Sequence, residues 1–152
     1  MSDSIKINIK RLSEDFNDVE LPGYSTEGSA GMDVRAAVKE DMVIHPGKVV
    51  LVPTNLSVEI PEGYEIQVRP RSGLAVKHGI GILNSPGTID SDYRGEVKII
   101  MMNFGVDDFS ISRGDRIAQL VVSKVYKANL VEKKELKESD RGEGGFGHTG
   151  KK

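Results

Sequence analysis

The sequence predicts an all-β domain: a jelly-roll β-barrel or sandwich with one short helix and a flexible, glycine-rich C-terminal tail. Its apolar clusters are short and mostly alternate with polar residues, which is the period of half-buried strands. Turn-forming residues separate these clusters. The chain has 152 residues, enough to bury one core, and it shows no internal repeat or second domain.

Candidate strands follow one another through the first third of the chain. Residues 5–10 alternate isoleucine with lysine and asparagine, and residues 30–36 form another strand-like stretch. That second stretch contains Asp33, which is buried and paired, exposed, or part of a site. Further on, residues 42–44 and 49–52 are apolar runs on either side of a His-Pro-Gly-Lys turn.

The middle of the chain adds alternating strands at 56–60 and 64–68, followed by one segment that does not fit a strand. Residues 72–78 predict a short helix, whose first turn the serine at its start is expected to cap. The apolar runs 80–83 and 97–102 are predicted strands, and they form the two arms of a hairpin around a polar loop.

The last strands are expected at 109–111 and 117–122, on either side of an Arg-Gly-Asp turn. Beside this turn, Asp115 and Arg116 are interpreted as a surface pair of little energetic value. Gln119 faces away from the buried side of its strand, so it is either solvated or part of a polar site.

Beyond residue 128 the periodicity fades, and five glycines lie between Gly142 and Gly150. Such a segment has too little apolar surface to pack by itself. We therefore divide the chain into a body at 1–140 and a tail at 141–152, which is expected to stay mobile until something orders it.

The composition excludes several classes of protein. A formal net charge of -2 argues against a nucleic-acid partner or a membrane-surface protein. The chain has no cysteine, which excludes disulfides and thiolate metal sites. No apolar run reaches the length of a membrane span, and the N-terminus lacks the apolar core of a signal peptide. A cytoplasmic location is therefore expected.

The polar loop at 84–96 has the richest chemistry in the sequence. It places Asp90 and Asp92 on either side of a serine, directly before Tyr93. Loops that present acids and an aromatic ring from a rigid scaffold are common ligand sites. An ordinary Asp-rich turn is the alternative interpretation.

Two further segments have the chemistry of anion sites. Residues 71–73, Arg-Ser-Gly, open the predicted helix, where backbone N–H groups favour phosphate; a surface turn with a capping serine is the alternative. Residues 145–150 fit G-x-G-x-x-G, but no strand precedes them and no helix follows, so a dinucleotide site is rejected. A Walker A motif also fails, because Lys152 stands where serine or threonine is needed. Glycine-rich backbone can still close around phosphate, or it is a plain disordered terminus.

Five segments, in this order, resemble the five motifs of trimeric dUTPases. They are residues 30–33, 71–75, 87–95, 114–119 and 141–150. The resemblance runs from about residue 20 to the C-terminus. It implies a β jelly roll, a homotrimer whose active sites are each shared by three subunits, and dUTP as the substrate. Departures are mild: Val34 and Val97 replace other apolar residues, and His148 stands where serine is frequent.

The resemblance also implies a role for each matching residue. Asp90 would orient and activate water, and Tyr93 would stack on deoxyribose and exclude a 2′-hydroxyl. Uracil would be read around Asn84, Thr88, Ile89, Asp90 and Lys98. Phosphates would be held by Arg71, Ser72, Gly73 and Gln119. The tail would close on the base with Arg141 and Phe146, and on the γ-phosphate with Gly147, His148 and Thr149.

The implied reaction is hydrolysis of dUTP to dUMP and pyrophosphate, which keeps uracil out of DNA and supplies dUMP for thymidylate synthesis. Mg²⁺ is the implied cofactor. Because no cluster of acids predicts an all-protein metal cage, we expect Mg²⁺ to bind through the triphosphate and water, with Asp33 in the surrounding polar shell. Two alternatives are a dCTP deaminase of the same fold and a nucleotide-binding regulator without catalysis. Asp90, Tyr93 and the complete glycine tail favour a dUTPase.

Overall fold

Short strands are the main regular elements of the structure, a computed structural model that describes residues 4–149. The strands are β1 (Asn8–Arg11), β2 (Gly23–Tyr24), β3 (Met32–Arg35), β4 (Met42–Ile44), β5 (Val49–Pro53), β6 (Leu56–Glu59), β7 (Tyr64–Arg69), β8 (Ile80–Ile82), β9 (Gly87–Ile89), β10 (Lys98–Asn103), β11 (Phe109–Ile111) and β12 (Arg116–Lys124). The helices are a 3₁₀ turn, η1 (Glu14–Phe16), and α1 (Ser72–His78). These elements confirm the predicted all-β jelly roll with one short α-helix.

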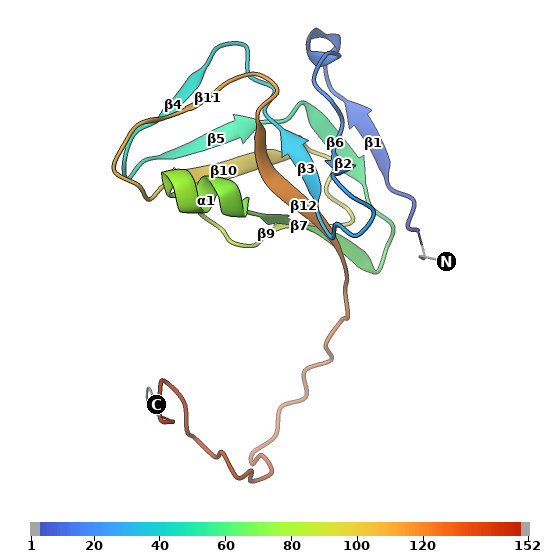
Figure 1. The fold of residues 1–152 in the computed structure, drawn as a ribbon. Coiled ribbons are helices and arrows are strands. Elements are labelled where there is room, and N and C mark those ends of the chain that lie inside the picture. The colour runs from blue at the N-terminus through green and yellow to red at the C-terminus, as the bar shows by residue number, and fades with distance from the viewer. Residues whose placement is uncertain (1–3, 150–152) are drawn as a thin grey trace.

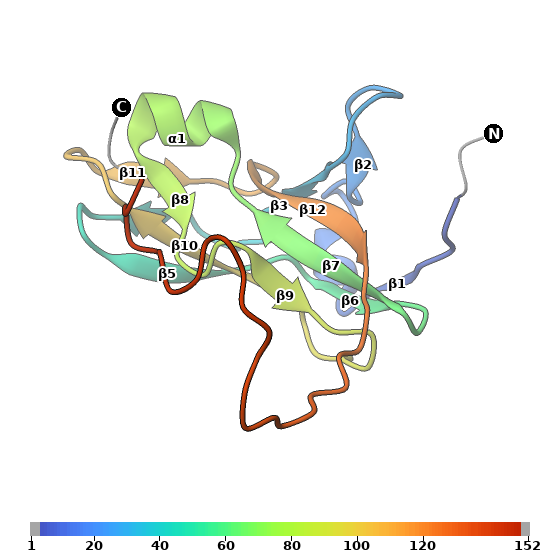
Figure 2. The ribbon, with the colours of Figure 1, turned by 90° about the horizontal axis from the view of Figure 1, so that it is seen from below.

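The strands form two larger sheets and two separate pairs, all antiparallel. The larger sheets have the orders β2-β3-β12-β7-β9 and β5-β10-β8, and the pairs are β1-β6 and β4-β11. Both larger sheets contribute to one core: Val34 and Ile66 come from the first, Val52 and Ile99 from the second. The helix α1 lies outside the sheets, beside β8 (Figures 1 and 2).

The predicted hairpin around the polar loop is only partly correct. Its arms do pair, with Met101 opposite Ile82. Within the loop, however, residues 87–89 form the strand β9, which leaves the hairpin and pairs with β7 in the other sheet. Gly87 and Ile89 are buried while Thr88 is exposed, so β9 is a half-buried edge strand. Three residues are too few for alternation to be recognised in the sequence.

The helix has the predicted bounds, but its start differs from the prediction. Arg71 is the N-cap residue and makes no side-chain capping hydrogen bond, so Ser72 belongs to the first turn instead of capping it. The helix ends at Gly79, whose φ of 66° lies in the left-handed region that glycine tolerates. A Cβ on Gly79 would also lie 2.7 Å from the backbone nitrogen of Gly105, so this position requires glycine.

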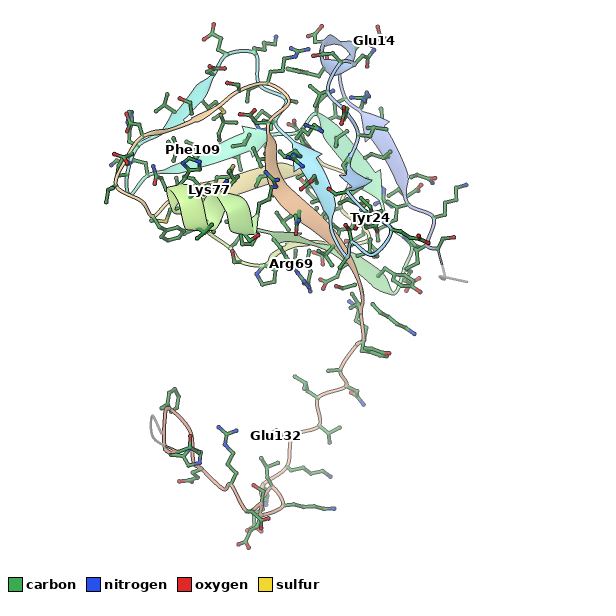
Figure 3. The ribbon with its side chains drawn as sticks, in the orientation of Figure 1. Glu14, Tyr24, Arg69, Lys77, Phe109 and Glu132 are labelled. Atoms are coloured by element: carbon green, nitrogen blue, oxygen red, sulfur yellow. The ribbon has the colours of Figure 1, made fainter. Side chains whose placement is uncertain are left out.

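The chain leaves the body after β12. The Val125 N–H donates to the Gly63 carbonyl at 2.8 Å, and residues 126–149 then contain no strand or helix. Figures 1 and 3 show this segment, with Glu132 on it, extending away from the sheets. The boundary between body and tail at 140/141 stays a prediction, and the last three residues of the tail lie outside the described range. As for membrane spans, α1 has only seven residues, and no other helix in residues 4–149 has the length and hydrophobicity to cross a bilayer.

An ion pair connects the N-terminal segment to the turn before β12. Arg113 donates from Nε to Asp18 Oδ2 at 2.9 Å, and its guanidinium lies 4.5 Å from the centre of the Phe16 ring. The hydrogen bond from Arg113 lowers the pKa of Asp18 below its ordinary value of 3.8. A carboxylate whose pKa is depressed on folding stabilises the fold above its unfolded pKa, and this contribution disappears as the pH falls through the folded value.

We therefore expect Asp18→Asn to lower the melting temperature at neutral pH. The decrease should be small, because the pair is exposed. The difference from the unmodified protein should shrink as the pH falls below 3.8, since protonation then removes the charge of Asp18 in the unmodified protein as well. Thermal unfolding of both proteins across this range measures it. A difference that stays constant with pH would show that the pair does not contribute.

Candidate functional site

A cavity of about 390 Å³ opens beside β9 and the start of β10. Apolar side chains from both larger sheets form part of its wall, among them Leu51, Val68 and Ile100. The cavity brings together six of the predicted site residues: Asn84, Thr88, Ile89, Asp90, Tyr93 and Lys98. It therefore unites the part of the site that the sequence assigns to the base, the sugar and the reacting water.

The edge strand β9 gives this cavity a polar backbone. It is the last strand of its sheet, so within residues 4–149 one side of it has no neighbouring strand. The N–H and C=O groups on such an edge can pair with a ligand that presents complementary groups. A Cβ on Gly87 would lie 3.1 Å from both Asn84 Nδ2 and Val68 Cβ, so the close packing here leaves little room for a side chain.

Asp90 directly follows β9 and is exposed. Among the described residues, its carboxylate makes no hydrogen bond or ion pair, so both oxygens are open to a ligand or water. The loop that follows turns back on itself, because the Tyr93 N–H donates to the Asp90 carbonyl at 3.2 Å. An acid that can accept a proton thus sits next to an aromatic ring in the same cavity.

Two hydroxyl groups of the β5–β6 segment hold this loop, and neither belongs to a residue that the sequence places in the site. Thr54 Oγ1 donates to the Val97 carbonyl at 2.5 Å, and Ser57 Oγ donates to the Arg94 carbonyl at 2.7 Å. Both residues are buried. Their one signal in the sequence was a polar cluster at the start of an otherwise apolar strand, where buried polar groups need partners.

Between these two hydroxyls, Asn55 adds a third connection. Its backbone N–H donates to Glu96 Oε1 at 3.0 Å, and its φ of 61° marks a tight turn. The Glu96 carboxylate also lies 3.6 Å from Lys98 Nζ. Residues 94–97, the C-terminal part of the loop, are thus fastened to the scaffold and are positioned before any ligand arrives.

A second group of candidate residues surrounds Asp33 on β3. Its side chain is only 12% exposed, its Oδ2 lies 3.3 Å from Arg116 Nη1, and its Oδ1 lies 3.2 Å from Arg71 Nε. Ser25 Oγ donates to Oδ2 at 3.2 Å. Of the three interpretations left open for Asp33, the structure excludes the exposed one and shows a mostly buried, paired carboxylate. The carboxylate sets the positions of two arginines that can meet an anion.

Asp115 and Arg116 do not form the surface pair that was one interpretation of this turn. Arg116 contacts Asp33, as described, while Asp115 Oδ2 accepts a hydrogen bond from the Ser112 N–H at 2.8 Å and closes the turn. A short aspartate beside a turn reaches the backbone of that turn more readily than the side chain of its neighbour in a strand.

Gln119 lies opposite Asp33 across the β3–β12 pair and is half-buried. A Cβ on Gly31 would lie 3.2 Å from the Gln119 side chain, so Gly31 leaves it room. Gln119 also lines a second cavity, of about 510 Å³, together with Arg69 and Pro86. Figure 3 shows Arg69 at the edge of the body below α1. The first cavity is not lined by the residues that the sequence assigns to the phosphates, Arg71, Ser72, Gly73 and Gln119. Within one chain, these residues therefore stay separate from those assigned to the base and sugar.

The tail holds the third group. Arg141 and Gly144 form a turn, with Arg141 Nε donating to the Gly144 carbonyl at 2.7 Å and the Gly144 N–H donating back at 3.0 Å. A second turn follows, because the His148 N–H donates to the Gly145 carbonyl at 3.1 Å. Phe146, between them, is fully exposed. Within residues 4–149 these tail side chains do not reach the first cavity.

Fold and site together define a jelly-roll protein that presents an acid and an aromatic ring in a small-molecule cavity. The dUTPase family model matches residues 17–150, so the chain belongs to the dUTPase family. It is 56% identical over 146 residues to a deoxyuridine 5'-triphosphate nucleotidohydrolase of Fusobacterium nucleatum, covering 96% of this chain and 99% of the relative. A relative of the same name from Brucella melitensis is 58% identical, and the match covers 95% of this chain and 92% of the relative.

Solved structures of the same family are also similar. A mutant dUTPase of Staphylococcus bacteriophage 80alpha with dUpNHpp has a TM-score of 0.84 and 27% identity, covering 95% of this chain and 98% of that one. A mutant dUTPase from phage phi11 of S. aureus, described as revealing the coordination of a structural Mg(II) ion, has a TM-score of 0.75 and 25% identity. It covers 86% of this chain and 97% of that one.

The residues around Asp33 fit a hydrated Mg²⁺ better than a directly bound one. Within residues 4–149 no three acidic or histidine side chains lie close enough to hold a metal. Asp33 Oδ1, however, is buried without a hydrogen-bond partner, because the nearby Arg71 N–H does not point at it. A buried carboxylate oxygen of this kind suits a water molecule bound to a cation.

The buried hydroxyls that hold the loop should contribute measurably to stability. Thr54→Val keeps the shape of the side chain but leaves the Val97 carbonyl without this donor. Leaving such a group unsatisfied costs about 1–3 kcal/mol, and we expect the free energy of unfolding to fall by that amount. Urea unfolding at a fixed protein concentration measures it. Ser110→Ala, on the exposed face of β11, is the matched control and should change little; equal losses in both variants would contradict the assigned role.

Proposed function

We propose that this chain hydrolyses dUTP to dUMP and pyrophosphate. The observation that carries the proposal is the cavity in which the edge strand β9, Asp90 and Tyr93 lie together. The edge backbone supplies the donors and acceptors that a pyrimidine ring needs, Tyr93 supplies a flat surface for a sugar, and Asp90 supplies a base. The family and the names of the relatives support the same substrate.

In the proposed reaction Asp90 accepts a proton from a water molecule. The water oxygen forms a bond to the α-phosphorus, and the bond from that phosphorus to the oxygen bridging to the β-phosphate breaks, which releases pyrophosphate. Arg71, held by Asp33, offsets negative charge on the phosphates. When bound, Mg²⁺ would neutralise further charge and orient the triphosphate, with Asp33 Oδ1 holding one of its waters.

The same proposal includes a homotrimer with shared active sites. One chain separates the candidate residues into the cavity, the Asp33 cluster and the tail, so a complete site needs parts of other copies. Val49, Leu51 and Leu83, on or next to the three-stranded sheet, are each about half exposed, as expected of a surface that another copy covers. The cytoplasmic location stays a prediction.

Pyrophosphate release from dUTP, dTTP, UTP and dCTP tests this function. We expect rapid release from dUTP alone, because a rigid backbone edge beside the base leaves no room for the methyl group of thymine. Comparable rates with dTTP would refute this role of β9. Ammonia released from dCTP would favour the deaminase alternative. Binding of dUTP without any product would favour a regulator.

Asp90→Asn should retain dUTP binding but lose most of the turnover, because an amide cannot accept the proton of the water. The expected loss in kcat is about 10²–10⁴-fold. Asp92→Asn is the matched control, since Asp92 lies two residues away but does not line the cavity, and it should stay close to the unmodified rate. A near-normal rate for Asp90→Asn would show that another group is the base.

A further inference from the structure

The ring of Tyr93 lies directly against a residue that has no side chain. A Cβ on Gly95 would lie 2.6 Å from Tyr93 Cζ and 2.9 Å from its Cε2. Both distances are far shorter than the usual separation of about 3.5–4.0 Å between carbon atoms in contact. This ring position is therefore available only while residue 95 is glycine.

A hydrogen bond holds the same, hydroxyl-bearing end of the side chain, since Tyr93 Oη is the atom that a Cβ on Gly95 would approach most closely. Tyr93 Oη donates to the Glu96 carbonyl at 2.9 Å. The Glu96 side chain is itself fixed, because it accepts a hydrogen bond from the Asn55 backbone. Tyr93 is 46% exposed and lines the cavity, yet the hydroxyl end of its ring is located by both the Gly95 contact and the hydrogen bond.

Backbone conformation does not explain why residue 95 is glycine. Several other glycines of the chain have a positive φ, for example Gly79 and Gly114, but Gly95 does not. Alanine can therefore adopt this backbone without strain. The atoms that it would displace belong to the end of a flexible side chain, so the ring would move and the fold would remain.

We propose that Gly95 is a specificity-determining residue: it positions the Tyr93 ring so that the cavity accepts deoxyribose and rejects ribose. The proposal rests on the proposed function, which places Tyr93 beside the sugar. A pocket that is merely apolar rejects an added hydroxyl only weakly, by about 10²-fold. Stronger rejection needs a wall that cannot yield, and Gly95 together with the Glu96 carbonyl keeps this wall in place.

The test compares kcat/KM for UTP and dUTP in Gly95→Ala and in the unmodified protein. We expect the UTP-to-dUTP ratio to rise at least about tenfold, because the displaced ring opens space for the 2′-hydroxyl. Tyr93→Phe, which keeps the ring but removes its hydrogen bond, should raise the ratio less. Gly28→Ala is the matched control: a Cβ there meets no atom within 4 Å, and the ratio should not change.

A double-mutant cycle separates a positioning role from a general loss of order. On a Tyr93→Ala background there is no ring to displace, so Gly95→Ala should leave the ratio unchanged. An equal rise on both backgrounds would overturn the proposal, as would an unchanged ratio in Gly95→Ala alone. A Gly95→Ala chain that fails to fold would contradict the claim that glycine serves the ring and not the backbone.

The unmodified protein distinguishes the failure of this proposal from that of the proposed function. If it does not hydrolyse dUTP in preference to UTP, the proposed function fails, and the role of Gly95 fails with it. If it shows the preference and Gly95→Ala keeps the same preference, only the role of Gly95 is refuted.

Discussion

The hydrogen bonds between the β5–β6 segment and the loop that ends at β10 are the constraint on which the site depends. Thr54 and Ser57 are buried hydroxyls, and each gives its proton to a carbonyl of that loop. Buried polar groups are costly unless they are paired, so these contacts fix one arrangement of the loop. This arrangement of the loop determines the positions of Asp90 and Tyr93 and the shape of the cavity.

A second constraint is electrostatic and is centred on Asp33 of β3, which β12 and β7 separate from β9 in the sheet. Asp33 is nearly buried and holds Arg71 and Arg116, which would otherwise repel each other. The strand β12 and the start of α1 thus present positive charge around one carboxylate on β3. The cavity at β9 and this arginine cluster divide the work that a nucleotide requires, because a base needs directional hydrogen bonds and phosphates need positive charge.

Much of the fold was predictable because most strands alternate cleanly and because one segment, 72–78, clearly does not. The loop residues Asp90 and Tyr93 were predictable from their chemistry and from the order of the motifs. The strand β9 was not, since three residues carry no usable period and its partner, β7, lies far away in the sequence. The partners of Thr54 and Arg116 were equally hidden, because local sequence does not encode which distant group a polar side chain will meet.

Three sets of candidate residues lie apart in one chain, and the central claim is that copies of the chain unite them. Mixing chains that carry Asp90→Asn with chains truncated after residue 140, each inactive alone, tests this directly. If one copy supplies Asp90 and another the tail, random reassembly of equal amounts should restore about one quarter of the sites. No recovery of dUTP hydrolysis, in mixed assemblies verified by mass, would contradict the account, because each site would then be complete within one chain.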